Sequence, residues 1–88
     1  MGLVEDIQNA VKSGKVILGY RQALKLIKTG SPKVVVIAKN IPENMKKTIE
    51  ENAKIGNVEV KTFDGSSIEL GITCGKSFPV STLVIKSG

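Results

Sequence analysis

The feature that most constrains the fold is an unbroken run of five apolar residues, Val34-Val35-Val36-Ile37-Ala38. A strand with one face in water alternates apolar and polar residues, whereas this run has no polar position. A strand of this kind is covered on both faces, as in parallel sheets that have helices on either side. The run therefore predicts a central strand in a layered α/β protein.

Helical and extended patterns alternate along the rest of the chain. Leu3, Ile7 and Val11 recur at the spacing of one helix face, whereas Val58 and Val60 alternate with charged residues as a half-exposed strand does. Glycine, proline and serine separate the segments. These patterns predict helices at about 3–12, 20–29, 43–55 and 68–72, and strands at 15–18, 34–38, 58–61 and 80–85.

Four helices that alternate strictly with four strands predict a sheet with a helical layer on each face. The fold class is therefore α/β, a small three-layer α/β/α sandwich with a four-stranded mixed sheet. The 88 residues suffice for one domain, which we expect to occupy residues 1–88. Residues 63–67 are expected to form a turn in which Ser66 or Ser67 caps the last helix.

The composition excludes several classes of site. The chain has no histidine, which removes histidine-based acid–base catalysis and histidine-containing metal sites. Its one cysteine, Cys74, removes cysteine-cluster zinc and any disulfide within the chain, and it fits a reducing compartment. The residues that flank Cys74 predict a buried position at a helix end. We expect no metal, no cofactor and no enzymatic activity.

Three other patterns argue against further classes. Asp64 and Glu69 are expected to flank a helix start, where acidic residues stabilise the helix. Gly75-Lys76-Ser77 looks like the end of a phosphate-binding loop, but that motif needs a glycine where Leu70 stands. No apolar run approaches the roughly 20 residues of a membrane span, and the start of the chain does not resemble a signal peptide. We therefore expect a cytoplasmic protein without a membrane partner.

Positive charge is concentrated in one part of the chain. Thirteen basic and eight acidic residues give a net charge of +5. The basic residues of segment 12–39, which holds no acidic residue, are Lys12, Lys15, Arg21, Lys25, Lys28, Lys33 and Lys39. The segment predicts a positive face on the domain, with a merely solvated helix face as the alternative. A positive face favours a nucleic-acid partner.

Three loops are expected to share one edge of the sheet, because the carboxyl ends of neighbouring parallel strands lie at the same edge. Ligands of layered α/β proteins bind at this edge. The loops follow the first and second strands and precede the last one. Gly19 lets an RNA backbone approach closely. Arg21, Lys25 and Lys39 suit contacts with phosphates.

Three other side chains of these loops suit contacts with bases. Gln22 and Asn40 carry amide groups that read base edges, and Phe78 suits stacking on an extruded base. Ordinary structural interpretations also exist: Gly19 as a tight turn, Asn40 as a loop former and Phe78 as a core residue. The convergence of these residues on one edge favours RNA binding.

Three blocks of the sequence resemble one known family. They are Lys12-Ser13-Gly14-Lys15 with Leu18-Gly19-Tyr20, then Ile37-Ala38-Lys39-Asn40-Ile41-Pro42, then Ile68-Glu69-Leu70-Gly71-Ile72-Thr73-Cys74-Gly75-Lys76-Ser77-Phe78. The family is the archaeal and eukaryotic large-subunit ribosomal protein thirty, a branch of the L-seven-Ae superfamily of kink-turn RNA binders. The resemblance covers essentially the whole chain and suggests an archaeal source.

The resemblance implies a role for the positions that match the motifs of the family. Positions 19–22 match a segment that contacts the sheared G·A pairs of the kink-turn, with Gln22 in place of a glutamate. Asn40 matches a base-contacting asparagine, and Phe78 matches an aromatic residue that packs on a flipped-out nucleotide. The implied RNA-binding residues are Gly19, Tyr20, Arg21, Gln22, Lys25, Lys39, Asn40, Lys46, Lys76 and Phe78.

The resemblance also implies a function. The chain would be a structural constituent of the large ribosomal subunit, monomeric when free, that binds a kink-turn-like element of rRNA beside neighbouring ribosomal components. One departure is Met45, which replaces a basic residue of the family and leaves Lys46 and Lys47 for its role. The alternatives are a stand-alone kink-turn or small-RNP protein outside the ribosome, and a small metabolite-binding protein or enzyme that uses the same edge.

Overall fold

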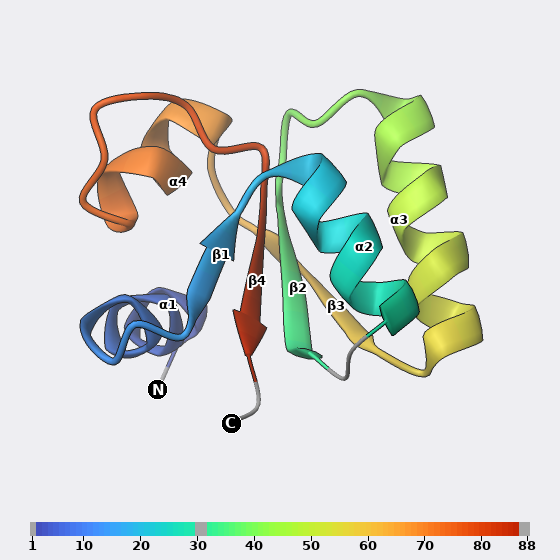
Figure 1. Cartoon of the computed structure of the whole chain (residues 1–88). Coiled ribbons are helices and arrows are strands. Elements are labelled where there is room, and N and C mark those ends of the chain that lie inside the picture. The colour runs from blue at the N-terminus through green and yellow to red at the C-terminus, as the bar shows by residue number, and fades with distance from the viewer. Residues whose placement is uncertain (1, 30–31, 87–88) are drawn as a thin grey trace.

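The computed structural model describes residues 2–29 and 32–86 (Figure 1). Helices and strands alternate along the chain as the sequence predicts. The helices are α1 (Leu3–Lys12), α2 (Tyr20–Thr29), α3 (Glu43–Gly56) and α4 (Ser67–Thr73). The strands are β1 (Val16–Leu18), β2 (Pro32–Ala38), β3 (Glu59–Phe63) and β4 (Thr82–Lys86).

The four strands form one mixed sheet in the order β1-β4-β2-β3. β2 and β3 are parallel, whereas β4 is antiparallel to both of its neighbours, β1 and β2. The register places Leu83 of β4 between Leu18 of β1 and Val36 of β2. β1 and β2 therefore point the same way, and the start of β4 lies beside their carboxyl ends. The predicted mixed sheet is confirmed.

Helices cover both faces of this sheet. Figure 1 shows α1 and α4 on one face and α2 and α3 on the other. Val34 and Val36 belong to the core under α1 and α4, whereas Val35 and Ile37 belong to the core under α2 and α3. Successive side chains of a strand point to opposite faces, so the whole apolar run is buried. The three-layer sandwich and the central position of this strand are confirmed.

Three strand boundaries differ from the prediction by two residues, and the others agree within one residue. β2 begins at Pro32 rather than Val34, because Pro32 is already paired with β4. β3 continues to Phe63, which was expected in the turn, because Phe63 pairs with Ala38 and is buried in the core. β4 begins at Thr82 rather than at Val80, whose N–H donates to a carbonyl of α4 at 2.9 Å instead of to a strand.

The short helix α4 is fixed at both ends by its sequence. Of the two candidate serines, Ser66 is the cap, and its hydroxyl accepts a hydrogen bond from the backbone N–H of Glu69 at 3.3 Å. At the other end Cys74 is buried in the core under α1 and α4, as predicted. Burial raises the pKa of the Cys74 thiol above its ordinary value of 9.0, and the positive charge of Lys76 opposes this rise.

We expect the contribution of Cys74 to stability to depend on pH. The folded chain holds the thiol proton to a higher pH than the unfolded chain, so this contribution is complete below about pH 9 and is lost as the pH rises through the raised pKa. The unfolding free energies of the wild type and of Cys74→Ala should therefore differ less at alkaline pH than at neutral pH. Urea denaturation of both proteins measures this. A difference that stays constant would contradict the assignment of Cys74 as a desolvated thiol.

Candidate nucleic-acid interface

The loops after β1 and β2 meet the residues before β4 at one edge of the sheet. The N–H of Gly19 donates to the carbonyl of Thr82 at 2.9 Å, and the N–H of Ala38 donates to the carbonyl of Ser81 at 2.9 Å. These bonds tie the carboxyl ends of β1 and β2 to the start of β4. We call the surface formed by residues 19–22, 39–40 and 78 the edge surface. The three loops share one edge, as the sequence predicts, but β1 and β2 are not neighbours, because the antiparallel strand β4 lies between them.

Gly19 holds the tight turn between β1 and α2. Its φ is 118°, a conformation that residues with a side chain rarely adopt. Its carbonyl accepts a hydrogen bond from the N–H of Ala23 at 3.0 Å, which begins α2. A Cβ at this position would meet only the Cγ of Gln22, at 3.9 Å. Gly19 is therefore required by the turn, and it also leaves space beside its backbone.

The start of α2 is electrostatically positive. Its first turn holds no acidic residue, so no side-chain charge offsets the partial positive charge of the first N–H groups. Arg21 and Gln22 are exposed there, and Lys25 is exposed one turn further on. Tyr20 is half-buried and packs against the core under α2 and α3. This helix end suits an anionic ligand such as a phosphate.

Asn40 fastens the loop after β2 to α4. Its Oδ1 accepts a hydrogen bond from the backbone N–H of Ser67 at 2.9 Å. Ser67 is the first residue of α4, and the first N–H groups of a helix have no acceptor within the helix itself. With Oδ1 engaged, the exposed Asn40 side chain offers a ligand its NH₂ group, which is a donor.

Lys39 forms an ion pair with Asp64 beside this loop. The Nζ of Lys39 lies 3.6 Å from Oδ1 of Asp64, and the two side chains are 71% and 95% exposed. A pair so exposed contributes little to stability. The backbone N–H of Lys39 donates to the carbonyl of Gly65 at 2.9 Å, which fixes the main chain under the charge. A phosphate could therefore take the place of Asp64 at small cost.

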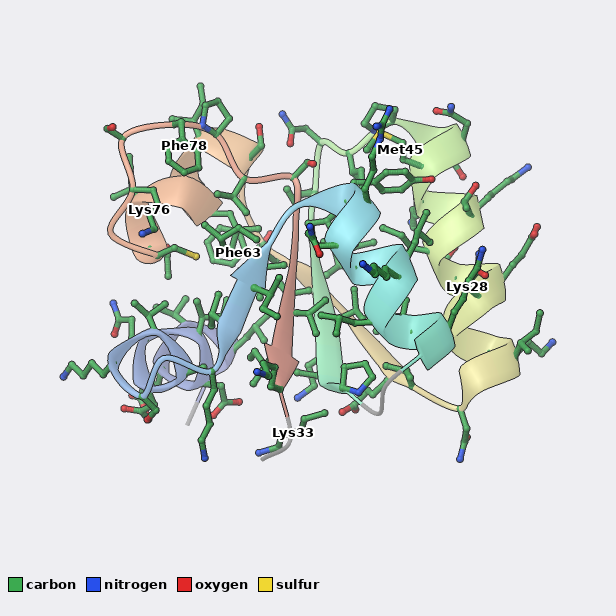
Figure 2. The ribbon with its side chains drawn as sticks, in the orientation of Figure 1. Lys28, Lys33, Met45, Phe63, Lys76 and Phe78 are labelled. Carbon is green, nitrogen blue, oxygen red and sulfur yellow. The ribbon has the colours of Figure 1, made fainter. Side chains whose placement is uncertain are left out.

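Phe78 is 52% exposed, so its interpretation as a core residue is wrong. Figure 2 shows Phe78 and Met45 at the same end of the molecule, on opposite sides of the sheet. The carbonyl oxygen of Phe78 packs against Gly71 of α4, and a Cβ at position 71 would overlap it. A hollow of about 190 Å³ is lined by both Phe78 and Gly19. The aromatic ring and the open glycine backbone thus belong to one surface.

Lys46 and Lys76 lie on opposite sides of the edge surface. Lys46 is half-buried in the first turn of α3, and its N–H donates to the carbonyl of Pro42 at 3.0 Å. Lys76 is exposed just beyond α4, and its N–H donates to the carbonyl of Gly71 at 2.8 Å. Because α3 and α4 cover different faces of the sheet, these lysines flank the surface instead of joining its centre.

The basic residues of segment 12–39 do not form one face, contrary to expectation. Arg21 and Lys39 lie at the edge surface, whereas Lys15 and Lys33 line a hollow at the other end of the sheet. The reason is topological, because β1 and β2 each carry the chain from one end of the sheet to the other. The single positive face predicted from the sequence is therefore wrong.

Two further properties concern metals and membranes. Among the described residues, no three histidine, cysteine, aspartate or glutamate side chains gather where a metal ion could bind. Within residues 2–29 and 32–86, no helix is both long and apolar enough to cross a membrane.

Residues 1–88 match the family described as Ribosomal protein L7Ae/L30e/S12e/Gadd45. The chain belongs to this family. It is 45% identical over 86 residues to the large ribosomal subunit protein eL30 of Methanosphaera stadtmanae, covering 98% of this chain and 88% of that protein. The eL30 protein of Methanothermobacter thermautotrophicus is 44% identical with the same coverage. The family resemblance inferred from the sequence is confirmed.

Solved structures of more distant proteins share the fold of this family member. A protein of unknown function from Bacillus halodurans C matches with a TM-score of 0.86 at 18% identity, over 97% of this chain and 84% of that one. A 15.5kD RNA binding protein from Giardia lamblia matches with a TM-score of 0.83 at 20% identity, over 98% of this chain and 72% of that one. At these identities the likeness concerns the fold alone.

Three residues that shape the edge surface are not identified as such by the sequence analysis. Asp64 was interpreted as an acid of the helix start but pairs with Lys39. Ser67 binds a side chain 27 residues away, which no local pattern indicates. Gly71 makes room for the carbonyl of Phe78. Its place in the family-like stretch from Ile68 to Phe78 is the one sequence signal that points to such a close contact.

We expect Asn40→Ala and Asn40→Asp to have different effects on stability. The alanine variant loses the acceptor for the Ser67 N–H and should lower the unfolding free energy by about 0.5–1.5 kcal/mol. The aspartate variant keeps that acceptor and adds a negative charge at the start of α4, so it should be at least as stable as the wild type. Urea denaturation compares the three proteins. Equal stability of Asn40→Ala and the wild type would contradict the fastening role.

Proposed function

We propose that this chain is a structural constituent of the large ribosomal subunit that binds a kink-turn-like element of rRNA through the edge surface. Its relatives at 44–45% identity are large ribosomal subunit proteins. The observation that carries the proposal is the pairing of an open glycine backbone with an exposed aromatic ring around one hollow, at Gly19 and Phe78.

Electrostatic contacts would supply much of the affinity, because each phosphate neutralised by a cation releases counterions. The acid-free start of α2 attracts a phosphate, and exposed Arg21, Lys25 and Lys39 surround the approach to it. Lys46 and Lys76 flank the same surface and extend the positive charge to both sides of the sheet. These contacts position an RNA without reading its sequence.

Contacts with bases would supply the specificity. Gln22 is exposed beside Gly19 and offers both a donor and an acceptor to a base edge. Asn40 offers its NH₂ donor, so it suits an acceptor on the RNA. Phe78 is exposed, so an extruded base can stack on its ring. Tyr20 instead packs against the core under α2 and α3 and so stabilises the turn at Gly19.

The proposal extends to the state and location of the protein. We infer that residues 1–88 act as a single RNA-binding domain, monomeric when free, in ribosomes of the cytoplasm. We infer no enzymatic activity, since the edge surface is built from amide, basic and aromatic groups and the sequence has no histidine. The neighbours would be rRNA and other components of the large subunit.

A stand-alone kink-turn protein outside the ribosome would use the same edge surface, so a different observation separates the two functions. If the chain is a ribosomal constituent, antibody detection across a sucrose gradient of native cell extract finds it with large subunits, at a salt concentration that retains known constituents. Recovery only in the light fractions would instead favour the stand-alone protein.

We expect Gly19→Glu to abolish kink-turn binding. The substitution places a carboxylate where a phosphate approaches and forces a side chain onto a φ of 118°, which costs about 1–3 kcal/mol of stability. The matched control is Gly14→Glu, which adds the same charge at a φ of 70° with no atom near the new Cβ, at the other end of β1. Gel-shift titration with a kink-turn RNA, below the melting temperature of both variants, measures the effect. Equal losses in the two variants would contradict the site.

We expect Phe78→Ala to weaken RNA binding without unfolding the protein. Loss of base stacking should cost about 1–3 kcal/mol of binding free energy. The melting temperature should change little, because Phe78 is 52% exposed. The control is Ile55→Ala, which removes an equally apolar side chain that is 87% exposed at the far end of α3. A large fall in melting temperature with unchanged RNA affinity would return Phe78 to a structural role.

A further inference from the structure

A second basic surface lies at the end of the sheet opposite the edge surface. It is a hollow of about 320 Å³ between α1 and the amino ends of β2 and β3. Four lysines line it: Lys15, Lys33, Lys61 and Lys86. Figure 2 shows Lys33 at the end of the molecule opposite Phe78 and Met45. The function proposed above makes no use of this surface.

Three of these lysines, Lys15, Lys86 and Lys33, form a row across the sheet, which we call the lysine row. Lys15 precedes β1, Lys86 ends β4 and Lys33 lies near the start of β2, so these three lie at the same end of three neighbouring strands. Lys61 of β3 pairs with Val36, three residues further along β2 than Lys33. The N–H of Lys86 donates to the carbonyl of Lys15 at 2.8 Å, which holds two of them side by side. Neighbouring strands lie about 4.8 Å apart, so the row spans about 10 Å. A row of this length suits an extended polyanion better than a single small anion.

The positive charge of this lysine row is not neutralised within the described structure. The hollow also contains Asp6 and Glu59, but within residues 2–29 and 32–86 neither forms an ion pair with a lysine of the row. The balance inside the hollow is therefore four positive charges against two negative ones. Like charges held this close repel one another, and a bound polyanion would relieve the repulsion.

The rest of the hollow suits RNA in particular. Half-buried Leu3 adds apolar surface to the lining, and the buried side chains of Val34 and Ile85 lie beneath it. The two carboxylates offer acceptors to 2′-hydroxyl groups, which an acidic peptide does not carry. The spaced cations, the apolar lining and the carboxylate acceptors together favour RNA over an acidic peptide.

We propose that the lysine row binds the backbone of a second RNA segment, distinct from the kink-turn. The two surfaces are separated by the length of β2, which has seven residues and spans about 20 Å. The protein would thus hold two segments of folded RNA at a fixed distance on either end of its sheet. The choice of RNA as the polymer rests on the proposed ribosomal function.

The test measures binding of a labelled single-stranded RNA of about 12 nucleotides without a kink-turn, by fluorescence anisotropy. The row variant is Lys15→Gln/Lys33→Gln/Lys86→Gln, in which all three side chains are exposed. The matched control is Lys28→Gln/Lys47→Gln/Lys54→Gln, which removes the same charge from exposed positions on α2 and α3. Each protein is measured free and saturated with a kink-turn RNA.

We expect the wild type to bind the second RNA equally well with and without the kink-turn RNA. The row variant should bind it about tenfold or more weakly, and the slope of log affinity against log salt should fall by about 2 to 3. Its kink-turn affinity should change by less than about twofold, and the control should retain binding of the second RNA. If the triple variant is unstable, Lys33→Gln should lower the slope by about 0.7–0.9.

Three results would overturn the proposal. They are equal losses in the row and control variants, displacement of the second RNA by the kink-turn RNA, and tighter binding of a poly-glutamate of equal charge to the row. Gly19→Glu separates this proposal from the ribosomal one, because it should lose the kink-turn RNA but keep the second RNA. A wild type that binds the second RNA through the row but no kink-turn RNA would sink only the proposed use of the edge surface.

Discussion

The structure depends on the antiparallel pairing of β4 between two strands that point the other way. Leu83 and Val84 are fully buried at the centre of this ladder, and each faces a different helical layer. Because β4 runs against β1 and β2, its start meets their ends, and its end meets their starts. One strand therefore links the two ends of the sheet, with Phe78 just before its start and Lys86 at its end.

The two ends differ in how they are built. At the edge surface, positive charge comes partly from the backbone of α2 and is combined with amide and aromatic side chains around a glycine turn. At the opposite end, the charge comes from lysine side chains alone, spaced by the strands that carry them. The first arrangement suits recognition of a particular RNA shape, whereas the second suits a backbone of any sequence.

The sequence predicts the layers well because their cause is local. The apolar run of β2 and the capping serine of α4 each act within a few residues, and both predictions hold. Phe63 and Val80 were misplaced because pairing across the sheet decides where those strands begin and end. For the edge surface, the residue types could be chosen from the sequence, but the Asn40 bond and the division of lysines between two ends depend on strand order.

The contact between Gly71 and the carbonyl of Phe78 has a consequence for how the protein could change over time. The position of Phe78 relative to α4 is set by a contact between two main-chain segments, the carbonyl of Phe78 and the backbone of Gly71. There is no room for even a methyl group between them. A substitution at position 71, whose side chain would be buried, would push the carbonyl of Phe78 away from α4 and so shift the loop that carries the ring. The preference for one RNA over another could thus be retuned from inside the protein, while every side chain on the surface stayed the same.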